Sequence, residues 1–191
     1  MSKLIYMAII GDPNISPEQR KKEIEYKEYL DNHISNVIQA WENMKHKPKC
    51  IQVIQDSPLL KSNIEYLKST VDNLVRNHDA SKYSAEEWEP YRRHWHPVNE
   101  QEKIDSKADM DRAWEHHYTT NMHHWDWWHI IHKEKDMLIC YVVEMCCDWI
   151  AMSMVKGGDA LSWFNNNKEI VLGPEQKKLV IELLTAYYES K

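Results

Sequence analysis

Histidine is the residue type whose number and spacing point to chemistry in this sequence. The chain has 11 histidines among 191 residues, and eight of them fall between His94 and His132. They include two adjacent pairs, His116-His117 and His123-His124, and a further histidine stands beside an aspartate in the doublet His78-Asp79. Imidazole nitrogen is the commonest metal ligand in proteins. Neighbours in a doublet lie about 100° apart around a helix, so both can reach one ion.

A pair of acidic residues lies within an apolar segment. Glu144 and Asp148 are four positions apart in the run from Met137 to Val155, so they share one face of a predicted helix. The run is about as long as a membrane span. However, an acid near a bilayer centre would cost roughly 2.5 to 3.5 kcal/mol. We therefore expect a buried helix of a globular protein, in which the acid pair needs a nearby cation.

The string His78-Asp79-Ala80-Ser81-Lys82 resembles the signature of the HD-domain superfamily of metal-dependent phosphohydrolases. The resemblance extends to an upstream histidine, His33, 45 positions before the doublet, and to Asp148, 69 positions after it. It covers about residues 33–151. It implies an all-α, HD-domain-like helical bundle in which one metal ion is bound by His33, His78, Asp79 and Asp148.

Members of that superfamily with further ions add histidines between the doublet and the last aspartate, often as an adjacent pair. The resemblance therefore implies His117, His123 and His124 as ligands of a second ion, with His116 as a substitute. It does not distinguish Mn, Fe, Co, Mg and Zn. The glycine-rich sequence of the cyclic-dinucleotide branch is absent from this stretch.

The implied chemistry is hydrolysis of a phosphoester. A divalent ion makes water more acidic and polarises a phosphoryl oxygen, so no protein nucleophile is needed. In this interpretation Lys82 binds a phosphate oxygen as a point charge. Glu144 or His116 transfers a proton to the leaving group. The expected substrate is a nucleotide or a related small phosphorylated molecule.

Each of these residues also has a simpler interpretation. The doublet could cap a helix, and Lys82 could neutralise Asp79 on a helix surface. Glu144 could orient a ligand histidine instead of moving a proton. Most of the nine tryptophans should belong to the core of a chain with a single Phe, and at most one or two, such as Trp125 or Trp128, would contact a ligand.

Helices are the elements that must position these groups. Ser16-Pro17 is a typical helix start, and Gly157-Gly158 and Gly173-Pro174 mark a later end and a later start. Ser84-Ala85-Glu86-Glu87 has the pattern of a capping box, a reciprocal pair of hydrogen bonds at a helix start. The sequence predicts helices over about 17–45, 59–79, 84–96, 108–118, 135–156 and from 174, a loop over 99–107, and short strands at Leu4–Ile10 and Ile51–Ile54.

Composition limits the classes of function. A length of 191 residues suits a single domain, 1–191, and four glycines are few for folds rich in tight turns. The formal charge of −6 gives no basic footprint for non-specific nucleic-acid or membrane binding. The four cysteines lack a CxxC pair, and no signal peptide is recognisable, so a cytoplasmic location is expected.

The sequence thus predicts an HD-type phosphohydrolase with one or two divalent ions. Two alternatives stay open. The same ligands could hold a di-iron centre for oxygenation, or the protein could bind metal without catalysis. A homo-oligomer is compatible with each of them.

Overall fold

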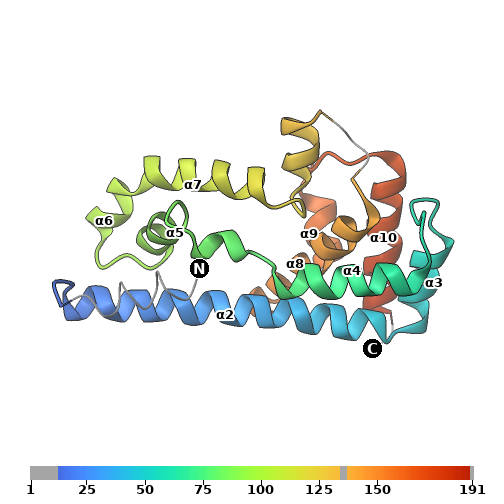
Figure 1. Ribbon diagram of the computed structural model, residues 1–191, viewed down its shortest axis with the longest axis horizontal. Coiled ribbons are helices and arrows are strands. Elements are labelled where there is room, and N and C mark those ends of the chain that lie inside the picture. The colour runs from blue at the N-terminus through green and yellow to red at the C-terminus, as the bar shows by residue number, and fades with distance from the viewer. Residues whose placement is uncertain (1–12, 134–136, 190–191) are drawn as a thin grey trace. The chain divides into compact units, whose positions relative to one another are not determined.

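The computed structural model describes residues 13–133 and 137–189. Every regular element among these residues is a helix, which confirms the all-α fold class (Figure 1). The predicted strand at Leu4–Ile10 lies outside the described residues. Within the described part of the chain, no helix is both long and apolar enough to cross a membrane.

The chain forms two compact units. The first contains Met1–Asn32 and Asp79–Asn121, and the second contains His33–His78 and Met122–Lys191. The chain passes between them three times: within one long helix, between His78 and Asp79, and between Asn121 and Met122. The single domain over 1–191 stays a prediction.

Short helices make up most of the first unit. They are η1 (Ala80–Tyr83), α5 (Trp88–Trp95), α6 (Glu100–Asp105) and α7 (Lys107–Thr120), together with the first half of α2 (Pro17–Lys45). Helix α2 begins as the sequence predicts, because the hydroxyl of Ser16 accepts a hydrogen bond from the backbone N–H of Gln19 at 3.1 Å. The ring of Tyr26 on α2 packs edge-on against Trp88 of α5.

The helices of the second unit surround an apolar core. They are the second half of α2, α3 (Pro48–Asp56), α4 (Ile64–Arg76), η2 (Trp127–Ile131), α8 (Ile139–Lys156), α9 (Ala160–Asn166) and α10 (Pro174–Tyr188). Helix α10 lies beside α3 and α8, and α4 also packs on α8 (Figure 1). Helix α8 is buried on several sides, as the sequence predicts for a core helix. This burial explains why most of its residues are apolar. Core residues include Trp41, Val71, Val143, Ile150 and Leu183.

Three local predictions are wrong. Ile51–Ile54 is part of helix α3, not a strand, because Pro48 starts a helix whose Cys50 and Ile54 are buried on one face. The predicted loop over 99–107 contains α6, whose first turn is capped by Asn99. Helix α5 begins at Trp88, so the predicted capping box at Ser84–Glu87 does not cap it.

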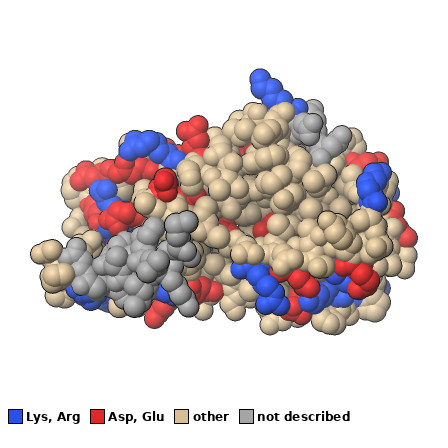
Figure 2. All heavy atoms as spheres, viewed as in Figure 1, with Lys and Arg blue, Asp and Glu red and all other residues tan. Residues whose placement is uncertain are grey.

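Figure 2 shows acidic and basic side chains on the same face of the molecule. Oppositely charged side chains are also neighbours within single helices: Lys22 and Glu25 on α2 are 2.9 Å apart, and so are Lys68 and Glu65 on α4. Exposed pairs of this kind each contribute at most about 1 kcal/mol to stability.

Candidate metal centre

Three predicted ligands come from three separate segments of the second unit. His33 belongs to the buried stripe of α2 that continues through Val37 and Ala40, at helical spacing. His78 follows the C-terminal end of α4, and its ring is buried. Asp148 lies one turn after Glu144 on α8. Residues far apart in the sequence therefore meet because His33 and Asp148 occupy inward positions of α2 and α8, and His78 is buried directly after the end of α4.

The donor atoms of these three residues lie close enough to share one ion. Nε2 of His33 is 3.1 Å from Oδ1 of Asp148, and Nε2 of His78 is 3.7 Å from the same oxygen. All three ligand atoms lie within 4.8 Å of one another. Two ligands at about 2.1 Å from a common ion are separated by roughly 3 to 3.5 Å. The spacing and the two-imidazole, one-carboxylate donor set both fit a divalent ion.

Electrostatics favours the charged form of Asp148. Burial alone would raise the pKa of this carboxyl, but hydrogen bonding and charge interactions with His33 and His78 outweigh it and hold the pKa well below its usual value. The aspartate is therefore anionic at neutral pH. A fixed negative charge between two imidazoles is a prepared cation site.

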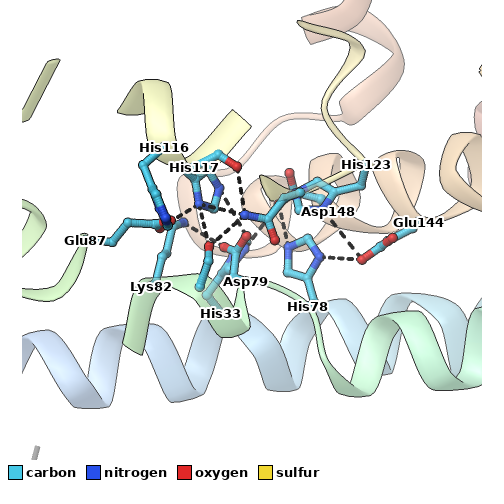
Figure 3. Close-up of polar contacts among 12 residues, drawn as sticks. His33, His78, Asp79, Lys82, Glu87, His116, His117, His123, Glu144 and Asp148 are labelled. Carbon is cyan, nitrogen blue, oxygen red and sulfur yellow. Dashed lines mark hydrogen bonds and ion pairs between the residues drawn. The ribbon is translucent and has the colours of Figure 1, made fainter. Parts of the chain in front are cut away.

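Glu144 contacts the predicted ligand His78 through the ring nitrogen that does not face Asp148. Its Oε1 lies 3.0 Å from Nδ1 of His78 (Figure 3). Because an ionised carboxylate can only accept, this contact places a proton on Nδ1, so Nε2, the nitrogen that faces Asp148, is the one that a metal ion would bind after displacing its proton. This contact favours the orienting role for Glu144 over proton transfer.

His123 joins the same unit beside His78. Their ring centroids are 4.2 Å apart, and Nδ1 of His123 is 3.6 Å from Oε1 of Glu144. His78, His123 and Glu144 form a second group with ligand atoms within 4.8 Å. The His124 ring centroid lies 4.3 Å from that of His123.

The remaining predicted site residues meet in the first unit. Oδ1 of Asp79 is 3.3 Å from Nε2 of His117, and Oδ2 of Asp79 is 2.6 Å from Nζ of Lys82 (Figure 3). Asp79 and His117 thus have a separation that suits two ligands of one ion. Lys82 compensates part of the charge of Asp79, as the simpler interpretation expects.

Glu87 is a residue of this cluster that sequence reasoning missed. It is completely buried, and its two oxygens lie 2.7 Å from Nδ1 of His116 and 2.8 Å from Nδ1 of His117. Burial alone would lower the pKa of His117, but Asp79 and Glu87 outweigh it and raise the pKa. Glu87 comes 29 and 30 positions before its partners, and only its place beside Trp88 hinted at burial.

The fold and these clusters define an all-helical protein with buried histidine and carboxylate groups at ligating distance. The chain belongs to the family of unknown function DUF5662, which it matches over residues 22–186. The matched range includes every residue of both clusters. No curated protein and no solved structure matches the chain.

Truncating Glu144 tests its contact with His78. We expect Glu144→Ala to weaken metal binding by about 10- to 100-fold, because the imidazole loses the carboxylate that fixes its tautomer and orientation. Glu144→Gln should lose less, since its amide oxygen can still accept from Nδ1. Competition against a chromogenic chelator measures both affinities, and Glu65→Ala on α4, at an exposed position, is the control. An unaltered affinity of Glu144→Ala would rule out the orienting role.

Proposed function

We propose that this protein is a metal-dependent phosphohydrolase that acts on a nucleotide or a related small phosphoester. The observation that supports the proposal most is the approach of His33, His78 and Asp148 to within ligating distance. These three residues also occur in an order and spacing that resemble the HD-domain superfamily.

His33, His78 and Asp148 would hold the ion, and Asp79, which follows His78 directly, is the fourth ligand that the resemblance implies. A bound divalent ion supplies Lewis acidity, which acidifies water and polarises a phosphoryl oxygen. The protein's own contribution is to keep the donors in place. Hydrogen bonding to Glu144 would keep the proton of metal-bound His78 on Nδ1 and so direct Nε2 to the ion, and the low pKa of Asp148 keeps that carboxylate charged.

His116 is the group best suited to proton transfer. Its side chain is 37% exposed, and its Nδ1 is held by the buried carboxylate of Glu87, which leaves Nε2 as the other protonation site. A histidine oriented in this way by a carboxylate is a common general acid. Lys82, whose side chain is 16% exposed and contacts Asp79, would hold a phosphate oxygen.

Elemental analysis and activity assays on one preparation test the proposal. Protein purified without chelators should contain a transition metal or Mg. Loaded separately with Mn, Co, Mg or Fe, it should release phosphate or a nucleoside from a panel of nucleotides. Oxygen uptake by the iron-loaded protein is measured in parallel. Oxygen uptake without phosphoester hydrolysis would favour the oxygenase, and tightly bound metal without either reaction would favour a binding protein.

A further inference from the structure

A small cavity lies between α8 and α9 in the second unit, and its described lining residues include no candidate metal ligand. One face of α8, the turn at Gly157 and the start of α9 form its walls, and the two helices pack against each other. Its volume is about 140 Å³. Pockets for drug-sized molecules measure roughly 300 to 1,000 Å³, so this cavity admits only a small molecule.

Two tryptophans supply aromatic walls of this cavity. Trp149 of α8 and Trp163 of α9 both line it, with ring centroids 5.2 Å apart and ring planes at 55°. Stacking on Phe164 supports the Trp149 ring, and Trp163 is 47% exposed, so a dissolved molecule can reach the corner between the indoles. The face of an indole attracts cations, and proteins recognise quaternary ammonium groups with several such rings.

Two side chains of opposite charge line the same cavity without forming an ion pair with each other. Lys156 lies two turns after Trp149 on α8, and Asp159 lies one turn before Trp163 on α9. Within the described part of the chain, Lys156 forms no ion pair with any carboxylate. Hydrogen bonds from the backbone and side chain of Ser162 lower the pKa of Asp159, which is therefore anionic at neutral pH. Each charge is thus available to a ligand.

This combination of groups selects for a zwitterion with a quaternary ammonium group. Lys156 repels a simple cation and Asp159 repels a simple anion, whereas a molecule with both charges satisfies both residues. A primary ammonium would also need three acceptors. However, Asp159 already accepts from the backbone N–H of Ser162 at 2.7 Å, and the hydroxyl of Ser153 donates to the backbone oxygen of Ile150. A quaternary ammonium needs no acceptor and suits the indole faces.

We propose that this cavity binds a small zwitterion whose quaternary ammonium group lies against Trp149 and Trp163 and whose carboxylate pairs with Lys156. Glycine betaine is the simplest molecule of this class and serves as the probe. The site is separate from the proposed phosphohydrolase function, and its test does not depend on turnover.

Isothermal titration calorimetry with three compounds of similar size tests the proposal. Glycine betaine carries both charges, 3,3-dimethylbutanoate has the same shape with carbon in place of the charged nitrogen, and choline lacks the carboxylate. We expect glycine betaine to bind about tenfold more tightly than either comparison compound, because each of them loses one of the two charge interactions. The proposal is overturned if glycine betaine shows no saturable binding, or if either comparison compound binds as tightly.

Single substitutions locate the bound probe. Trp163→Leu should weaken the binding of glycine betaine about tenfold and leave that of 3,3-dimethylbutanoate almost unchanged, because it removes an aromatic face and keeps an apolar wall. Lys156→Gln should weaken both carboxylates and leave choline no weaker. Trp95→Leu, at a position 60% exposed, and Lys178→Gln, with a side chain 61% exposed, are the matched controls and should keep all three affinities. Unaltered binding of glycine betaine in either Trp163→Leu or Lys156→Gln would refute this site.

Discussion

Replacing His78 with alanine is expected to reduce bound metal to background and to abolish phosphoester hydrolysis. His78 offers Nε2 to the site shared with His33 and Asp148, so its removal takes away one of the three ligand atoms that lie within 4.8 Å of one another. Elemental analysis after dialysis measures the first effect, and phosphate release measures the second. The helical circular dichroism should persist, because the core of the second unit consists of apolar residues on other positions.

His46 provides the matched control for this substitution. It is also a histidine of the second unit, but its side chain is 74% exposed and contacts only α2. His46→Ala should therefore leave metal content and turnover unchanged. Since His78→Ala also removes one partner of the buried Glu144, Asp148→Asn serves as a second variant that removes charge with little change in shape. Stoichiometric metal in both site variants would refute the proposed centre.

The sequence is most informative where local chemistry determines the structure. Ser16 and Pro17 define the start of α2. Gly157 ends α8 with φ of +79°, a backbone conformation that glycine adopts without steric cost. In contrast, Ile51–Ile54 contains three β-branched residues, which favour a strand when taken alone. Burial of one helical face of α3, beside α10, overrides that preference.

The candidate centre is predictable to the extent that its residue types are unusual. A histidine on an apolar stripe and an aspartate within an apolar helix are expensive to bury alone, so His33 and Asp148 stand out without a structure. Glu87 does not stand out, because it follows another glutamate in a polar segment. Its partners are determined by the packing of α5 against α7, which no local pattern encodes. Local signals therefore identify candidate ligands, while tertiary packing determines the residues that orient them.

The buried arginine of the first unit should dominate the stability of that unit. Arg92 on α5 is completely buried, and its guanidinium lies 3.0 Å from Glu23, 2.6 Å from Glu89 and 2.9 Å from Glu102. We expect Arg92→Met to lower the free energy of unfolding by about 3 to 5 kcal/mol, because it leaves the buried carboxylate of Glu23 uncompensated. Urea denaturation followed by circular dichroism measures this loss. Arg112→Met, at a position 71% exposed on α7, should change it by no more than about 0.5 kcal/mol.

The stability lost in Arg92→Met should depend on pH, because it arises from the charge of Glu23. A second substitution that removes this charge should restore part of the stability. Burial raises the pKa of Glu23 despite opposing effects of Trp88 and Arg92, and removing Arg92 should raise it further. A carboxyl whose pKa is raised by folding destabilises the protein as the pH increases beyond the pKa of that carboxyl in the unfolded chain, about 4.3. The loss in Arg92→Met should therefore be greater at pH 7 than at pH 5. In the unaltered protein, Nε1 of Trp88 donates to the carboxylate of Glu23 at 2.7 Å. Adding Glu23→Gln removes the charge, and the amide oxygen of the glutamine can still accept this hydrogen bond. The double variant should thus be more stable than Arg92→Met at pH 7. If instead the losses of the two single variants add up in the double variant, the effect of Arg92→Met comes from packing alone.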